Sequence, residues 1–338
     1  TDDAAMTNGA TAGTRRGNGH DDPTFHDDVE AYCGRSSYRA GDTVGLHVST
    51  VRERYDVRVE RWGAERVEVW RSADPIAGRH HHVPDDADAR GCRWPVEVEI
   101  PIDPSWPSGV FLVTVTAHDA EPDRSVAHAC FVVRPPRPTA NTLLVLGTNT
   151  WNAYNNWGGC SLYTGGTQVS FRRPFARGML SRPEVERDDR KARPVRWGEE
   201  PDADGRIFQT YRTERHYPAA IGSSGWFTHE RRFVEWAESH GWAFDMAVSS
   251  DLDLDQSALD GYDLVVSVGH DEYWSASQRA AFEAHVRSGG NAAVFSGNTM
   301  FWQVRLEDDG DTMVGFQSAA HRDDPVLHSD PTAITGMW

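Results

Sequence analysis

The segment GHDEYWS, residues 269–275, contains two side chains that could carry out acid–base or metal chemistry. His270 and Glu272 are two positions apart, so in an extended segment they project to the same side, with Asp271 opposite. A histidine and a carboxylate on one side can bind a metal or act as an acid–base pair. The alternative is the start of a helix, where carboxylates are common on any protein surface. The local sequence leaves both interpretations open.

Two tyrosines, Tyr154 and Tyr163, bracket a turn that contains Asn-Asn-Trp-Gly-Gly. Aromatic packing is one interpretation, because the chain is rich in tryptophan. Metal binding is the other, because a phenolate is a hard, anionic oxygen donor that suits an oxidised iron. A tyrosine has a pKa near 10, so a strong Lewis acid would have to drive its deprotonation.

Two further residues, Asn298 and Cys160, follow predicted strands or tight turns. Asn298 could donate to a substrate carbonyl oxygen or bond its own backbone in a turn, and the sequence does not choose between these. Cys160 follows two glycines but has no base near it in the sequence. In an amidotransferase-like fold the nucleophilic cysteine would occupy the turn that here reads Gly269-His270-Asp271. Acyl transfer to a thiol is therefore disfavoured.

The elements that must position these residues belong to the second half of the chain, residues 142–338. Continuous apolar runs predict buried strands, and helical spacing predicts helices between them. The predicted strands cover 142–148, 242–250, 262–269 and 291–298, and the predicted helices cover 229–241 and 275–290. In the first helix, Phe233, Trp236 and Ala237 form the predicted apolar face. This order predicts a doubly wound, mostly parallel α/β domain, whose strand ends bring the three polar segments together.

The first half of the chain has a different sequence pattern. Apolar and polar residues alternate within short segments, and turns rich in Gly, Pro and Asp separate these segments. This pattern predicts an Ig-like β-sandwich over residues 28–134. Residues 1–27 have almost nothing to bury and are predicted to be a disordered lead-in. Three prolines between residues 135 and 141 predict a stiff linker to the catalytic α/β domain. Residues 164–225 lack clear periodicity and are expected to form a long excursion over the surface or the site.

Composition excludes several classes of function. The net charge of −17 argues against binding to nucleic acid and against adsorption to anionic membranes. The sequence contains no run of 18 apolar residues, the length that could span a bilayer.

The four cysteines form no CxxC pair, and reduced thiols are favoured over one disulfide among Cys33, Cys92 and Cys130. With no N-glycosylation sequon, these features favour a cytoplasmic protein.

Three segments of the second half together resemble the large (β) subunit of N,N-dimethylformamidase and its C-terminal-domain relatives. They are WNAYNNWGGCSLY (151–163), VSVGHDEYWS (266–275) and FSGNTMFWQ (295–303). The segments VEAYCGRSSYRAGDTVGLHVST (29–50) and IPIDPSWPSGVFLVTV (100–115) resemble the sandwich that precedes this domain. The resemblance covers residues 28–338. The chain ends early for this family, and we expect its catalytic domain to be truncated at the C-terminus.

The resemblance implies an amide hydrolase with one mononuclear ferric iron (Fe3+). Its ligands would be Tyr154, Tyr163 and Glu272. His270 would transfer protons and Asn298 would contact the substrate. The implied activity is cleavage of a small, formamide-type amide by iron-activated water.

A non-catalytic binding protein is the alternative function. Its aromatic residues could hold a carbohydrate, with Trp151, Trp157 and Trp274 as stacking platforms. The expected partner of the enzyme is a small amide. The sequence does not decide whether the chain forms a homo-oligomer or needs a small accessory subunit.

Overall fold

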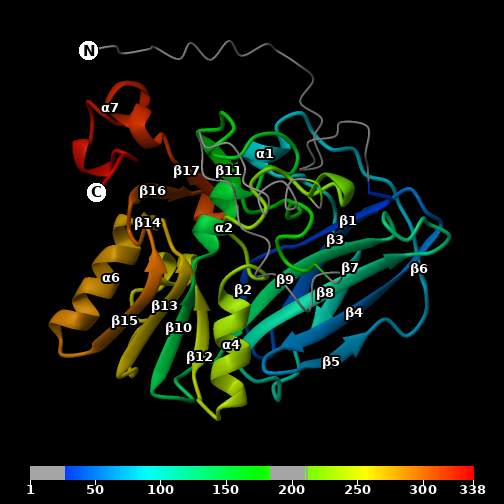
Figure 1. Cartoon of the computed structure of the whole chain (residues 1–338), viewed down its shortest axis with the longest axis horizontal. Helices are drawn as coiled ribbons and strands as arrows, with labels where there is room; N and C mark the ends of the chain where they lie inside the picture. Colours follow the sequence, from blue (N-terminus) through cyan, green and yellow to red (C-terminus); the bar gives the residue numbers. More distant parts are fainter. Residues whose placement is uncertain (1–26, 183–209, 211) are drawn as a thin grey trace.

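The computed structural model describes residues 27–182, 210 and 212–338. The predicted lead-in, except for Asp27, and much of the predicted excursion over 164–225 lie outside these residues. Figure 1 shows strands β1–β9 on one side of the molecule and a parallel sheet with helix α6 on the other. The chain is therefore a mixed α/β protein. Within the described ranges, no helix has the length and apolar character needed to cross a membrane.

The first part of the molecule, β1–β9, consists of two β-sheets. One sheet has the order β1-β3-β7, with β1 (Val29–Cys33), β3 (Thr43–Thr50) and β7 (Val98–Pro101). The other has the order β2-β9-β8-β4-β5, with β6 paired to β4: β2 (Ser37–Arg39), β9 (Val126–Arg134), β8 (Gly109–Ala117), β4 (Arg54–Trp62), β5 (Arg66–Arg71) and β6 (Ile76–Ala77). Along β4, Tyr55, Val57 and Val59 alternate with exposed residues and enter one apolar core. The predicted strands are present, and the Ig-like classification stays a prediction.

The second part contains a four-stranded parallel sheet in the order β12-β10-β13-β15. Its strands are β10 (Thr142–Leu146), β12 (Asp245–Val248), β13 (Leu264–His270) and β15 (Asn291–Gly297), and its helices are α4 (Glu230–Ser239), α5 (Ser249–Leu254) and α6 (Ala276–Arg287). This confirms the predicted strands and the two predicted helices, α4 and α6, whereas α5 was not predicted. Because β10 lies between β12 and β13, the strand order reverses at β10. Ligand sites in open α/β sheets lie beyond the carboxyl ends at such a reversal.

Two features at these carboxyl ends were not predicted from the sequence. The short helix α2 (Thr148–Tyr154) follows β10 directly. A second small sheet has the order β11-β17-β16-β14, with β11 (Gln168–Ser170), β17 (Thr312–Val314), β16 (Trp302–Glu307) and β14 (Tyr273–Ser275). The described chain also contains several short helices: α1 (Ala87–Arg90), α7 (Ala320–Asp323), η3 (Asp308–Gly310), η4 (Gln317–Ala319) and η5 (Pro331–Ala333). Since β14 begins three residues after β13 ends, residues 271 and 272 connect the two sheets.

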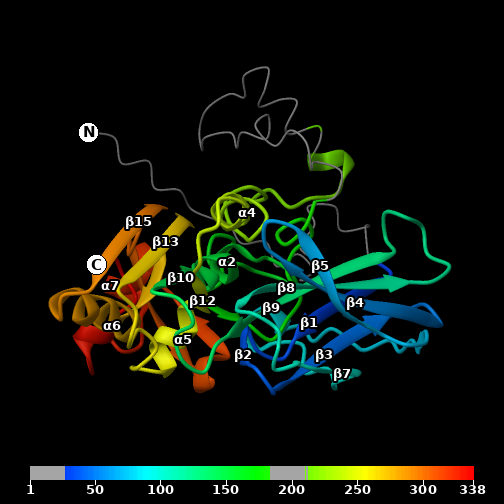
Figure 2. The same cartoon turned by 90° about the horizontal axis from the view of Figure 1, so that it is seen from below.

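The predicted apolar face of α4 is wrong in part. Trp236 is 47% exposed, and the buried residues of the helix include Glu230 and Val234 together with Ala237. Both views place α4 between the parallel sheet and the first part of the molecule (Figures 1 and 2). Its polar residues find partners there, since Arg61 donates to both oxygens of Glu238. Helical periodicity alone does not reveal such a polar, buried face.

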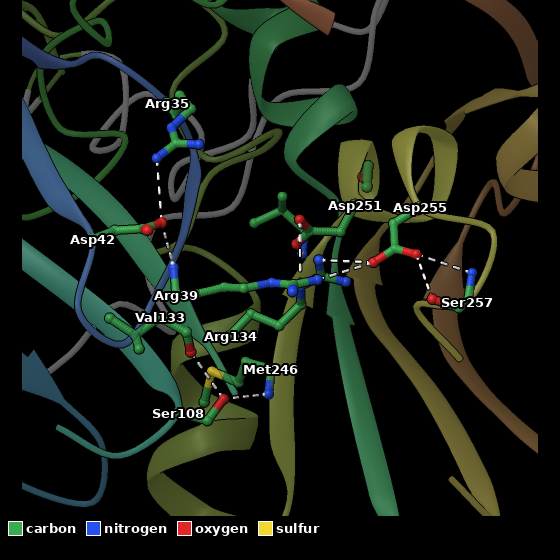
Figure 3. Close-up of polar contacts among 12 residues, drawn as sticks. Arg35, Arg39, Asp42, Ser108, Val133, Arg134, Met246, Asp251, Asp255 and Ser257 are labelled. Atoms are coloured by element: carbon green, nitrogen blue, oxygen red, sulfur yellow. Dashed lines mark hydrogen bonds and ion pairs between the residues drawn. The ribbon is translucent and has the colours of Figure 1, made fainter. Parts of the chain in front are cut away.

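The two parts of the molecule are joined by charged contacts and by a shared core. Arg134, at the end of β9, pairs with Asp251 and Asp255 of the α5 region, and Arg39 also reaches Asp255 (Figure 3). The Ser108 hydroxyl accepts from the Met246 backbone N–H and donates to the Val133 carbonyl. The largest apolar cluster contains side chains of both parts, among them Tyr32, Trp62, Trp94, Leu144, Trp151 and Trp226. The domain boundaries stay a prediction.

Candidate functional site

Helix α2 is the element that builds the site from the β10 side. Its residues 148–153 are all buried, although four of them are Thr or Asn. Their polar groups bond to distant segments: Thr148 to Ser249, Asn149 to Gln278, Trp151 to Glu230 and Asn152 to Val169. Buried polar groups need such partners. The helix is therefore fixed on all sides, and its last residue is Tyr154.

Glu272 lies at the centre of the site. The Tyr154 hydroxyl donates to Glu272 Oε2 over 2.9 Å, and the Tyr163 hydroxyl donates to Oε1 over 2.6 Å. The two tyrosine rings stack with their centroids 4.4 Å apart. Glu272 is 3% exposed, whereas Tyr163 is 45% exposed. The site is thus buried at the carboxylate and open to solvent at Tyr163.

The turn before Tyr163 depends on glycine. A Cβ atom at Gly159 would lie 2.8 Å from the Asp88 carboxylate, which accepts from the Cys160 backbone N–H at 2.7 Å. Gly159 therefore lets the chain pass close to Asp88 and return Tyr163 beside Tyr154. Cys160 itself serves the turn through its backbone. All four cysteines are free thiols.

His270 contacts the same carboxylate from the end of β13. Its Nε2 atom is 3.2 Å from Glu272 Oε2 and 3.4 Å from Asn298 Nδ2. Its Nδ1 atom is 2.8 Å from the Ser223 carbonyl oxygen, which can only accept a hydrogen bond. Nδ1 therefore carries a proton. Nε2 either accepts from Asn298 when the ring is neutral or donates to Glu272 when it is charged.

The charges of these groups affect one another. Burial acts to raise the pKa of Glu272, but hydrogen bonds from His270 and Tyr163 outweigh burial and lower it. Burial acts to lower the pKa of His270, but its bonds to Glu272 and to the Ser223 carbonyl outweigh burial and raise it. Burial and the Glu272 hydrogen bond raise the pKa of Tyr163 to about 12. Burial and the Glu272 charge raise the pKa of Tyr154 still further. The protein alone thus favours a His–Glu ion pair beside two neutral phenols.

The donor atoms fit a hard cation. Two phenol oxygens contact the two oxygens of one carboxylate, and hard oxygen donors suit an oxidised iron. In residues 27–182, 210 and 212–338, no group of three or more His, Cys, Asp or Glu could hold a metal ion. A metal at this place therefore depends on the tyrosine oxygens, as the resemblance implied.

The structure brings all five predicted site residues together: Tyr154, Tyr163, His270, Glu272 and Asn298. Their roles in metal binding and catalysis stay predictions. Asn298 has a positive φ of 52°, so it occupies the turn that the sequence left open, and its side chain also reaches His270. Both of its proposed uses are compatible with this position.

Several residues next to the site were missed from the sequence. Thr150 accepts from the backbone N–H groups of Glu272 and Tyr273. His229 lies with its ring 6.2 Å from the ring of His270. Thr150 is four residues before Tyr154, a helical spacing that could have identified it had α2 been predicted. The Ser223 carbonyl is a backbone group in the region without periodicity, and no signal in the sequence indicates its role.

The carbohydrate platform proposed as an alternative is wrong. Trp151, Trp157 and Trp274 are each 1% exposed. They pack in the interior, and their ring faces are not available to a sugar. Tyr163, by contrast, is 45% exposed.

Two of the solved structures that match this chain are remote likenesses. The two tandem V-type regions of the chitin-binding protein VCBP3 match at 10% identity and a TM-score of 0.23, covering 35% of this chain and 58% of that chain. A chain from a structure of T cell activation by the bacterial superantigen toxic shock syndrome toxin-1 matches at 11% identity and a TM-score of 0.20, covering 31% of this chain and 97% of that chain. Neither likeness carries an argument about the fold.

Comparison with curated proteins found no match. A protein-family model, described as N,N-dimethylformamidase beta subunit-like, C-terminal, matches residues 56–338. This match covers most of the chain and includes every residue of the site. The chain therefore belongs to the N,N-dimethylformamidase beta subunit-like, C-terminal family.

Proposed function

We propose that the chain is an iron-dependent hydrolase that cleaves small linear amides of the formamide type. The observation that carries this proposal is the convergence of the Tyr154 and Tyr163 hydroxyls on the two oxygens of the buried Glu272 carboxylate. The family, which is that of a dimethylformamidase subunit, supports hydrolysis of an amide. A ferric ion held by these three residues would supply Lewis acidity toward an amide carbonyl and toward water.

The protein residues would handle protons and orient the substrate. Because the Ser223 carbonyl holds a proton on Nδ1 of His270, protons move at Nε2, the nitrogen that faces Glu272 and Asn298. In its charged form His270 can give that proton to the leaving amine. The Asn298 amide can then turn from His270 and donate to the carbonyl oxygen, where negative charge develops.

The fold types of the two parts and the location of the protein are proposed together with this function. The two sheets of the first part support an Ig-like sandwich, and the parallel sheet of the second supports an amidotransferase-like domain. Four free cysteines support a cytoplasmic location.

The test combines iron analysis, a visible absorption spectrum and hydrolysis of formamide and N,N-dimethylformamide. We expect bound iron, a tyrosinate-to-iron absorption band, and release of formate with ammonia from formamide or with dimethylamine from N,N-dimethylformamide. Glu272→Gln should lose all three. The matched control is Glu97→Gln, because Glu97 also pairs with a histidine, His81, at 2.8 Å, but lies in the first part of the molecule. Iron-free protein whose amide hydrolysis is unchanged by Glu272→Gln would contradict the proposal.

A further inference from the structure

Thr150 contacts the backbone of the site at Glu272 and Tyr273. The residue is fully buried in α2. Its hydroxyl oxygen accepts from the Glu272 backbone N–H at 2.8 Å and from the Tyr273 backbone N–H at 3.2 Å. A hydroxyl oxygen has two lone pairs, so it can accept both bonds at once. One side chain thus fixes the backbone where β13 passes into β14.

The same helix also holds the side chain of Glu272. Thr150 and Tyr154 are four residues apart, so they lie on one face of α2. Tyr154 donates to the Glu272 carboxylate at 2.9 Å. One helix face therefore contacts Glu272 at two points, at its backbone through Thr150 and at its carboxylate through Tyr154. Because α2 holds Glu272 at both its backbone and its carboxylate, the side chain of Glu272 has little conformational freedom.

We propose that Thr150 is a positioning residue of the site, whose hydroxyl oxygen sets the place of Glu272 relative to Tyr154. This inference rests on the proposed function, in which these two side chains bind iron. Groups that orient metal ligands typically change metal affinity or activity by roughly 10–100-fold when they are removed. Thr150 would act in this way although it touches neither substrate nor metal.

Two substitutions separate the hydroxyl from the shape of the side chain. Thr150→Val keeps the shape but removes the oxygen, and it leaves two buried N–H groups without their acceptor. Thr150→Ser keeps the oxygen. The matched control is Thr114→Val in β8, because Thr114 is 8% exposed and its buried hydroxyl has no hydrogen-bond partner among the described residues. If Thr150→Val does not fold, Thr150→Ala removes the same oxygen and takes its place.

The experiment measures iron affinity by competition with a chelator, the tyrosinate-to-iron band, and kcat and KM for N,N-dimethylformamide. For Thr150→Val we expect iron affinity or kcat to fall by roughly 10–100-fold with little change in KM, together with a shifted band. Thr150→Ser should behave like the wild type, and so should Thr114→Val. Wild-type behaviour of Thr150→Val would overturn the proposal. Equal losses in Thr150→Val and Thr150→Ser would also overturn it, because the loss would then come from packing.

A crystal structure of metal-free Thr150→Val tests the inference independently of the proposed function. We expect the contact between the Tyr154 hydroxyl and Glu272 Oε2 to lengthen beyond hydrogen-bonding distance, and an unchanged contact would overturn the positioning role. If the wild type neither binds iron nor hydrolyses amides, the proposed function fails. The crystallographic distance then still decides whether Thr150 positions Glu272.

Discussion

At the scale of single residues, Glu272 combines properties that rarely occur together. It is almost fully buried, yet the contacts of His270 and Tyr163 keep its pKa low, so it remains a carboxylate. The pKa values of the two tyrosines shift in the opposite direction and are raised, because a phenolate beside this carboxylate would be buried next to a like charge. Without a cation, the two phenol oxygens and the two carboxylate oxygens are therefore held together by the two phenolic protons.

Iron binding should consequently release protons. Tyr163 has its pKa raised to about 12, and that of Tyr154 is higher, so both are protonated near neutral pH before iron binds. Ligands must be deprotonated to bind a metal, so the affinity should rise with pH, with a slope of about two protons per iron. Competition titrations with a chelator between about pH 6 and 8 measure this slope.

Tyr163→Phe provides the comparison for this measurement. The variant lacks one phenolic proton, so its slope should fall to about one. The exposed position of Tyr163 allows this exchange without damage to the core. An iron affinity of the wild type that does not change with pH would show that the tyrosines do not ionise when iron binds.

At the scale of elements, glycine at the end of β13 is required by the neighbouring helix. Gly269 has a φ of 89°, and a Cβ atom there would lie 2.5 Å from the Cβ atom of His229, which precedes α4. Gly269→Ala should therefore destabilise the fold by about 1–2 kcal/mol for the left-handed backbone and about 1–3 kcal/mol for the overlap. It should also displace His270, the next residue. Urea unfolding measures the stability, and the pH profile of amide hydrolysis reports on His270.

Gly241→Ala isolates the effect of the overlap. Gly241 also has a positive φ, 76°, but no atom of the part of the chain that the structure describes lies within 4 Å of its added Cβ atom. This variant should lose only the backbone contribution. Equal destabilisation of the two variants would mean that α4 moves away from β13 at little cost.

The elements also show how far the sequence could predict the site. The strands and the helices α4 and α6 were predicted because apolar residues repeat at the periods of buried strands and helices. Helix α2 was not, because Thr148, Asn149 and Asn152 are polar residues buried by hydrogen bonds to segments far along the chain. The site residues were found from their types and from the family resemblance. Their common contact, the Glu272 carboxylate, follows only from the positions of α2 and the second small sheet.

At the scale of the whole molecule, buried acids next to the site should make stability depend on pH. Glu230 of α4 is fully buried, and Trp151 Nε1 donates to it at 2.8 Å. Burial raises its pKa to about 8, from an ordinary value of 4.5. The folded state therefore keeps a proton that the unfolded state loses. Stability from this group is complete below about pH 4.5 and is lost as the pH rises toward about 8.

Replacing Glu230 with glutamine should remove this dependence, because an amide does not ionise in this range. Wild type and Glu230→Gln should have similar unfolding free energies near pH 4.5, and the variant should become the more stable one as the pH rises. The difference at pH 8 should be on the order of 5 kcal/mol at most, since each pKa unit corresponds to about 1.4 kcal/mol. Urea unfolding at several pH values measures it, with the exposed Glu99→Gln of β7 as control. A constant difference across this range would mean that Glu230 is ionised in the folded protein, and that the core shared by the two parts accommodates its charge.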